Sequence, residues 1–84
     1  MKQMNKKKLP YLRSYAPPDI TYYEGLAIQG QHSREIYLVK QQRRHAFPDF
    51  NTFLKMGFGI DKVKMVDRDI IAALPLGDPL ISIP

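Results

Sequence analysis

Residues 35–47 read EIYLVKQQRRHAF, and this stretch decides the fold. Residues 35–39 are rich in β-branched and aromatic side chains, which favour a β-strand. Residues 43–47 can pair back on them as a hairpin, with residues 40–42 in the turn. The two glutamines of this turn are poor turn formers, because tight hairpin loops favour Asn-Gly or Asp-Gly. We therefore predict a hairpin and leave the geometry of its loop open.

The sequence on either side of the hairpin predicts one more strand and a first helix. Residues 26–29, LAIQ, form a short strand candidate ahead of the hairpin. After Pro48 and Asp49, the apolar residues Phe50, Phe53 and Leu54 have the i, i+3, i+4 spacing of a helix. Phe47 and Phe53 are expected to wedge the hairpin against this helix, because buried aromatic rings dominate a small core.

A second helix is predicted toward the end of the chain. Gly57 suits the left-handed position that closes the first helix, and residues 58–66 then contain a second apolar cluster, with Phe58 expected to cover the second helix. Asp67 is a good N-cap for a helix over residues 68–74, which Pro75 and Gly77 end. The tail at residues 80–84 alternates apolar and polar side chains, which favours an added edge strand.

These elements predict a small α+β domain. We expect a three-stranded antiparallel β-meander followed by two short helices, with an extended basic N-terminal arm. The arm, rich in proline and tyrosine, would cover residues 1–20, and the α+β domain residues 21–84. A body of this size buries too little surface to be more than marginally stable alone, so docking onto something larger is one way for it to gain stability.

Composition limits the classes of protein to consider. The chain has no Cys, which excludes disulfides and thiolate metal sites and fits a reducing compartment, intracellular or organellar. No apolar run approaches the ~20 residues of a membrane-spanning helix. Residues 9–13, LPYLR, are too short and polar for the core of a signal peptide. A remnant of an organellar transit peptide stays open, although Pro10, Pro17 and Pro18 disfavour a continuous helix.

Positive charge is concentrated at the start of the chain. Five basic residues and no acidic residue lie in residues 1–13, namely Lys2, Lys6, Lys7, Lys8 and Arg13. Residues 14–84 hold eight basic and eight acidic residues, so residues 1–13 account for the whole net charge of +5. A localised cationic arm implies an acidic or polyanionic contact surface. That surface could belong to a protein assembly, a nucleic acid or an anionic membrane.

The residues predicted to bind a partner follow from this charge distribution. Leu9, Tyr11, Leu12 and Tyr15 could lie in a groove of the partner, beside the basic side chains. Arg43 and Arg44 add charge on the predicted hairpin, where Tyr37 could offer a ring for a single-stranded nucleic acid, although a solvated basic hairpin is favoured. The predicted partner-binding residues are Lys6, Lys7, Lys8, Tyr11, Arg13, Tyr15, Arg43 and Arg44.

The sequence offers little chemistry for catalysis. His32 and His45 are a weak metal signal, because tetrahedral zinc requires three or four ligands. Asp61, Asp67 and Asp69 do not have the spacing of a calcium loop, and Asp67 and Asp69 suit the start of a helix. Gly57 and Gly59 follow a helix rather than a strand, unlike a phosphate-binding fingerprint. We therefore expect no enzyme activity, no catalytic residue, no metal and no cofactor.

The region from residue 25 to residue 80 resembles a short module of bacterial and algal proteins. The resemblance rests on EIYLV at 35–39, RRHAFPD at 43–49, TFLKMGF at 52–58, VKMV at 63–66 and LPLGDPL at 74–80. One departure is the turn, where the module usually carries Asn-Gly or Gly-Gly. The resemblance implies the α+β fold and no particular activity, since the module has no established function. It often occurs in tandem copies, so whether the chain is a whole protein or one copy of an array stays open.

These observations favour a non-catalytic interaction or assembly module. We expect a small accessory subunit that docks onto a larger complex through its basic arm. The alternative is a nucleic-acid-associated accessory protein, such as one bound to a ribosome or to RNA.

Overall fold

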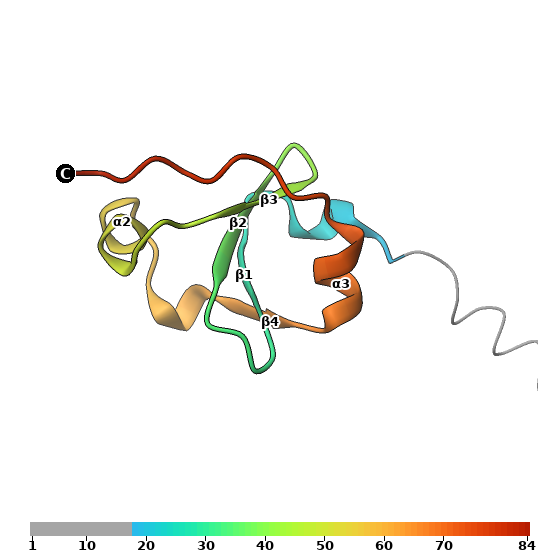
Figure 1. The fold of residues 1–84 in the computed structure, drawn as a ribbon. Helices are drawn as coiled ribbons and strands as arrows, with labels where there is room; N and C mark the ends of the chain where they lie inside the picture. Colours follow the sequence, from blue (N-terminus) through green and yellow to red (C-terminus); the bar gives the residue numbers. More distant parts are fainter. Residues whose placement is uncertain (1–17) are drawn as a thin grey trace, which may run out of the picture.

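The computed structural model describes residues 18–84 (Figure 1). This range contains two 3₁₀ helices, four strands and two α-helices. In chain order they are η1 (Ile20–Tyr23), β1 (Ala27–Gly30), β2 (Ile36–Lys40), β3 (Arg43–Ala46), α2 (Phe50–Lys55), η2 (Ile60–Lys62), β4 (Lys64–Val66) and α3 (Arg68–Ala73). The prediction of an α+β domain with two short helices is confirmed.

The sheet differs from the predicted antiparallel meander. Its strand order is β3-β2-β1-β4. The pairs β1–β2 and β2–β3 are antiparallel, as expected, whereas β4 pairs parallel with β1, with Ile28 opposite Lys64 and Gly30 opposite Val66. The fourth strand lies in the segment that we interpreted only as an apolar cluster. The prediction of three antiparallel strands was therefore wrong in strand number and in the direction of one pairing.

The loop of the β2–β3 hairpin is a tight two-residue turn. Lys40 pairs with Arg43, and the two residues between them have positive φ, 54° for Gln41 and 59° for Gln42. Positive φ at both central residues is the signature of the type I′ turns that join twisted strands. The sequence departs from the preferred residues of this turn, yet the backbone adopts its geometry.

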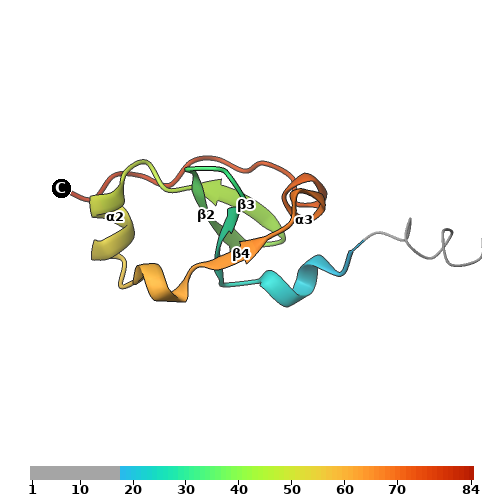
Figure 2. The same ribbon diagram turned by 90° about the horizontal axis from the view of Figure 1, so that it is seen from below.

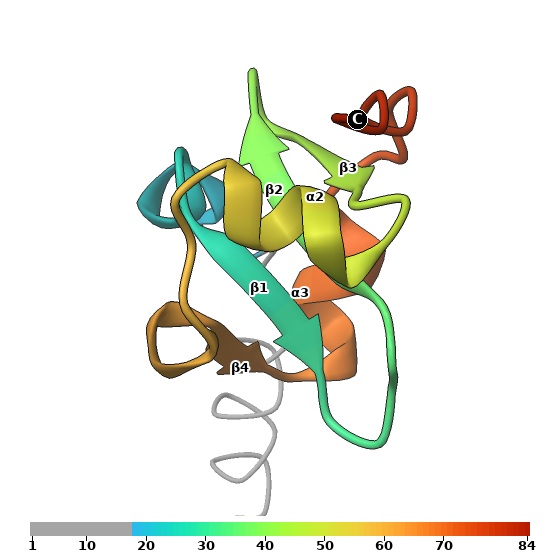
Figure 3. The same ribbon diagram turned by 90° about the vertical axis from the view of Figure 1, so that its left-hand side faces the viewer.

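Two layers of side chains cover the two faces of the sheet. On one face a core of Ile28, Tyr37, Val39, Val66 and Leu74 packs with residues of η1 and α3. Ala27 and Leu38 pair with each other on the opposite face, because successive side chains of a strand alternate. Both are buried. Figure 3 shows α2 in front of β1 and β2 and α3 behind them, so each helix covers one face.

The aromatic wedge lies at the α2 end of the molecule. The side chain of Phe53 is 0% exposed, and its ring packs edge-on against Phe47 at 5.3 Å between centroids. This confirms the predicted contact between hairpin and first helix. Phe58 contacts the same two rings, at 5.5 Å from Phe47 and 5.8 Å from Phe53. The expectation that Phe58 would cover the second helix was wrong, because the chain reverses at Gly57 and returns the ring to α2.

The first helix begins after Asp49, as predicted, whereas the start of the second differs from the prediction in its capping. The carboxylate of Asp49 accepts a hydrogen bond from the backbone N–H of Thr52 at 2.7 Å, which caps α2. Asp67 occupies the N-cap position of α3, but within residues 18–84 its side chain makes no capping hydrogen bond. The predicted capping role of the Asp67 side chain was therefore wrong. Gly57 has φ 92° after α2, as predicted for a left-handed helix end.

The C-terminal tail covers the free edge of β3 without forming a regular strand. Leu76 makes an isolated parallel bridge with Arg44, and Leu80 donates its N–H to the carbonyl of Ala46 at 2.9 Å. Beyond this point the tail turns to α2, where the N–H of Ile83 donates to the hydroxyl of Thr52 at 3.1 Å. Figure 1 shows the tail passing β3 and ending beside α2. The predicted edge strand at residues 80–84 is thus replaced by single hydrogen bonds.

Candidate functional site

Most of the predicted partner-binding residues belong to the basic arm. Lys6, Lys7, Lys8, Tyr11, Arg13 and Tyr15 all lie outside the residues that the structure describes. The described part of the chain begins at Pro18 and enters the domain through η1. Ile20 and Tyr23 of η1 pack against the core of the α3 face. These contacts anchor η1, through which the described chain enters the domain, on the core.

The two predicted arginines of the hairpin lie on opposite faces of the sheet. Arg43 is exposed, whereas Arg44 is half-buried and points toward α3. The Nε–H of Arg44 donates to the carbonyl of Ile71 at 3.0 Å and to that of Leu74 at 2.9 Å. These carbonyls belong to the last turn of α3, where a cation is favourable. Arg44 therefore holds the helix on the sheet, and Arg43 presents its charge to the surroundings.

Tyr37 is a core residue rather than an exposed ring. It is 9% exposed, and the guanidinium of Arg44 lies over its ring with Cζ 5.0 Å from the centroid. Its hydroxyl donates to Oε1 of Glu35 at 2.9 Å. Burial raises the pKa of the Tyr37 hydroxyl above its ordinary value, and the hydrogen bond to Glu35 adds to the rise. Tyr37 does not offer the exposed face that base stacking requires.

Tyr22 of η1 has the exposure that Tyr37 lacks. It is 62% exposed, and the Nζ of Lys64 lies 5.4 Å from its ring centroid. Lys64 stands on β4, an edge strand of the sheet. An exposed ring beside a lysine is the combination that single-stranded nucleic-acid surfaces use. The sequence did not single out this pair, because its members are far apart along the chain.

The two histidines have separate environments. His45 is half-buried, with Nδ1 2.8 Å from the carbonyl oxygen of Asp78 and Nε2 3.3 Å from that of Lys40. A side chain at Gly77 would collide with the His45 ring, so the tail packs directly on it. His32 is exposed on the turn after β1. In residues 18–84 no group of three or more His, Cys, Asp or Glu residues has the arrangement of a metal site.

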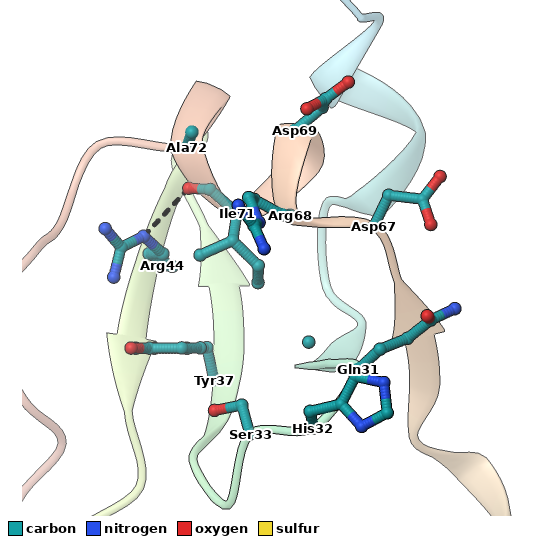
Figure 4. A pocket seen from close by; sticks show the side chains of 11 residues that line it. Gln31, His32, Ser33, Tyr37, Arg44, Asp67, Arg68, Asp69, Ile71 and Ala72 are labelled. Carbon is teal, nitrogen blue, oxygen red and sulfur yellow. Dashed lines mark hydrogen bonds between the residues drawn. The ribbon is translucent and has the colours of Figure 1, made fainter.

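A groove opens between the β1–β2 turn and the start of α3. Its volume is about 690 Å³, and it is lined by residues of β1, the following turn, β2, β3 and α3. In Figure 4 the side chains of Ser33 and His32 lie below the groove, and Ile71 and Arg68 of α3 lie above it. Tyr37 and Arg44 close one side. The groove brings together residues from four separate parts of the chain.

Charged groups surround this groove unevenly. Arg44 and Arg68 both line it, and the Nε–H of Arg44 is held by the last turn of α3. Asp67 and Asp69 also belong to its lining, but their carboxylates point outward in Figure 4. The Nη groups of Arg44 also point away from the centre of the groove in the same view.

A set of exposed apolar side chains gathers at the α2 end of the molecule. Phe50 is 54% exposed and stacks on the fully buried Phe53, with 5.3 Å between centroids. Leu54 lies one turn further on the same side of α2 and is also exposed. Ile81 and Ile83 of the tail are exposed, and hydrogen bonds from Ser82 and Ile83 attach the tail to α2. We call this set, Phe50, Leu54, Ile81 and Ile83, the apolar end.

The apolar end and η1 lie at opposite ends of the domain. Figures 1 and 2 both show α2 and the C-terminus at one end, with η1 and α3 at the other. The basic arm therefore joins the domain far from the apolar end. None of the helices in residues 18–84 has the length and apolar character that a membrane crossing requires.

Sequence reasoning missed the groove because no local pattern encodes it. Its walls come from residues that are separated by the hairpin, α2 and β4. One unusual feature of its rim is visible only in the structure. His32 has a φ of 64°, in the left-handed region that non-glycine residues rarely occupy.

Comparisons with known proteins add no relative to this description. No protein-family model, no curated protein and no solved structure matches the chain.

Proposed function

We propose that the chain is a non-catalytic interaction or assembly module, an accessory subunit that docks onto a larger complex through its basic arm. The observation that carries this proposal is the separation of charge. Residues 1–13 hold five basic residues and no acidic one, whereas the remaining 71 residues are balanced. A cationic segment on a neutral domain attracts a surface of opposite charge over several ångströms. The partner is a protein assembly with an acidic or polyanionic surface.

The apolar end supports a second contact with the same assembly. Phe50 presents about half of its side chain to solvent while its ring stacks on Phe53. Aromatic side chains on rigid supports are enriched in the energetic centres of protein interfaces. Because the arm joins at the other end of the domain, both contacts can form at once. Two weak contacts on one linked chain bind more tightly than either alone.

The alternative is binding to RNA, and the pair of Tyr22 and Lys64 favours it. Tyr22 is exposed with Lys64 beside its ring, and both lie at the end of the domain where the arm enters. A base stacked on Tyr22 would place its phosphates near Lys64 and the arm. Binding to RNA in this way does not involve the apolar end. The two proposed functions therefore depend on different residues.

Affinity purification at low and high salt tests the proposed function. The bait is the full chain, compared with Lys6→Ala/Lys7→Ala/Lys8→Ala. A matched control, Arg34→Ala/Lys40→Ala/Lys62→Ala, removes the same charge from exposed positions of the domain. We expect a defined protein complex to be retained by wild type and by the control at low salt. It should be lost with the arm variant and released from wild type by added salt.

The same experiment includes the outcomes that contradict the proposal. If the arm variant retains the complex as well as wild type at every salt concentration, docking does not depend on the arm. If nuclease treatment releases the retained material, and purified RNA binds wild type as tightly as the protein complex does, the RNA alternative replaces the proposal. In that case Tyr22→Ala should weaken binding and Phe50→Ala should not.

A further inference from the structure

The two edges of the sheet differ in what covers them within residues 18–84. The sheet order places β3 at one edge and β4 at the other. The tail covers β3, where the N–H of Arg44 donates to the carbonyl of Pro75 and its carbonyl accepts from the N–H of Gly77, both at 2.9 Å. In this range β4 pairs with β1 alone, and Figures 1 and 3 show it on the outside of the sheet. An uncovered edge strand presents backbone groups that can pair with another chain.

The register between β1 and β2 shows which way the backbone groups of β1 point. The N–H of Val39 donates to the carbonyl of Leu26 at 3.0 Å, and its carbonyl accepts from the N–H of Gly25 at 2.7 Å. Val39 therefore directs its backbone groups toward β1. Tyr37 does the same, because alternate residues of a strand point to the same side. Tyr37 lies opposite Ile28, so these two residues exchange hydrogen bonds.

The groups of β4 follow from this alternation. Since Ile28 faces β2, the next residue, Gln29, faces β4. Gln29 lies opposite Met65 in the parallel pair, where a residue bonds to the two neighbours of its opposite residue. Gln29 thus pairs with Lys64 and Val66, and the N–H and C=O of Met65 point away from β1. Within residues 18–84 no other backbone segment accepts or donates a hydrogen bond at Met65.

The side chains beside this edge offer apolar contacts on both faces. Met65 is 54% exposed and Tyr22 is 62% exposed. Successive side chains of a strand alternate, so Lys64 and Met65 lie on opposite faces of the sheet, and Tyr22 lies on the face of Lys64. A strand added at Met65 would therefore contact Met65 on one face and Tyr22 on the other. Cross-strand contacts of this kind stabilise paired strands.

A second copy of the chain fits this edge poorly. Two copies of β4 paired antiparallel about Met65 would place Lys62 of one copy opposite Arg68 of the other. Both side chains are exposed and cationic. Like charges directly opposite each other destabilise a strand pair. The occupant of this edge is therefore expected to be a different chain.

The entry of the basic arm gives the charge of that chain. The charged residues next to or in β4, Asp61, Lys62, Lys64 and Asp67, balance one another. Residues 1–17, however, join the described chain at Pro18 and η1, and Tyr22 of η1 contacts Lys64. The five basic residues of positions 1–13 therefore enter beside this edge without an acidic residue among them. An acidic segment on β4 would be attracted by both.

From these observations we infer that β4 binds an extended, acidic segment of the partner as an added strand, through the N–H and C=O of Met65. The acidic character of the partner rests on the proposed function, and the backbone contact goes beyond it. β4 has three residues, so the added strand binds weakly alone. Linkage to the basic arm on the same chain strengthens the binding.

Backbone amide NMR of the full chain tests this inference with a blocked heptapeptide of alternating glutamate and valine. The control peptide carries lysine in place of glutamate. With the acidic peptide we expect a saturable shift of the Met65 amide at millimolar concentrations and slower exchange of its proton. The amides of Lys64 and Val66, which face β1, should keep their exchange rates. The lysine peptide should give no saturable shift.

Two variants at one position separate the backbone contact from the side-chain contact. Met65→Pro removes the outward N–H, and proline is tolerated on an edge strand where the N–H faces solvent. It should weaken binding of the acidic peptide about tenfold. Met65→Val keeps both the N–H and an apolar side chain, so it should bind like wild type. If Met65→Pro does not fold, the exchange rate of the Met65 amide in wild type decides.

Four results would overturn the inference. They are the absence of a saturable shift at Met65, equal binding of the lysine peptide, unchanged binding in Met65→Pro, and tighter binding of oligouridylate than of the acidic peptide at the same amides. A Met65 shift that depends on protein concentration alone would also overturn it, because a second copy would then occupy the edge.

The proposed function can fail separately from this inference. If Lys6→Ala/Lys7→Ala/Lys8→Ala loses the protein complex while the acidic peptide leaves Met65 unaffected, the proposed function stands and the strand contact does not. If the acidic peptide protects the Met65 amide but no complex depends on the arm, the strand contact stands alone.

Discussion

The carboxylate of Glu24 accepts a hydrogen bond from the backbone N–H of Gln41 at 2.6 Å. Its other oxygen accepts one from the N–H of Gln42 at 2.9 Å. One side chain from before β1 therefore satisfies both N–H groups of a hairpin loop 17 and 18 residues further along the chain. Both glutamines have the positive φ of a type I′ turn, which Asn-Gly would adopt at lower cost. Glu24 compensates from a distance for an unfavourable turn sequence.

Replacing the two turn glutamines should stabilise the protein. Gln41→Asn/Gln42→Gly keeps both N–H donors for Glu24, lowers the strain of the left-handed backbone at residue 41 and removes it at residue 42, a gain of about 1–2 kcal/mol. Urea denaturation measures it. Gln31→Gly is the matched control, because Gln31 is an exposed turn residue outside the left-handed region. A loss of stability in the double variant would show that the glutamine side chains themselves hold the turn.

The same contact predicts sensitivity to acid. The backbone hydrogen bonds of Gln42 and Gln41 lower the pKa of Glu24 below its ordinary value of 4.5. A carboxyl group with a lowered pKa in the folded state adds stability that is full above its ordinary value. That stability is lost as pH falls through the lower folded-state value. Melting temperatures of wild type and Glu24→Gln should therefore differ at neutral pH and converge as the pH falls below 4.5. Equal melting temperatures at neutral pH would refute this.

The fold was predictable where its signals are local. The strand at residues 35–39, the strand after the turn and both helices have propensity or spacing patterns within a few residues. β4 could not be recognised in this way, since it is three residues long and pairs with β1 across more than thirty residues of sequence. Its one buried side chain, Val66, gives no alternation to detect. The groove and the hydrogen bonds of Glu24 to the hairpin loop could not be predicted for the same reason. Each depends on residues that come together only in the folded sheet.

The aromatic cluster should dominate the stability of the domain. Phe53 is 0% exposed and contacts the rings of Phe47, Phe50 and Phe58. Phe53→Ala should cost about 3–5 kcal/mol, the range for a buried phenylalanine, and leave the domain largely unfolded. Phe50→Ala, at a ring that is 54% exposed, should cost much less. Thermal unfolding with and without a chelator checks both variants. A stable Phe53→Ala, or a chelator-induced loss of structure, would contradict this account.

The two aspartates before the helices should differ in importance. Asp49 caps α2 through Thr52 and also accepts the hydroxyl of Ser82 at 2.8 Å, so it links the helix to the tail. These hydrogen bonds, that of the Thr52 backbone first, lower the pKa of the Asp49 carboxyl. Asp67→Ala loses no such bond. We expect the melting temperature to fall more for Asp49→Ala than for Asp67→Ala. The reverse order would mean that Asp67 caps α3 in solution.

Arg44 should be intolerant of even the conservative change to lysine. Its Nε–H donates to two carbonyls of α3 while the guanidinium covers Tyr37. A lysine ammonium has no donor at the Nε position and no planar group for the ring. Arg44→Lys should therefore cost about 1–3 kcal/mol, the range for a lost hydrogen bond to a charged group. Arg43→Lys is the matched control, because Arg43 is the exposed neighbour on the same strand, and it should be close to neutral. Urea denaturation of both variants provides the comparison. Equal stabilities would show that α3 is held by its apolar face alone, through Ile70, Ile71 and Leu74.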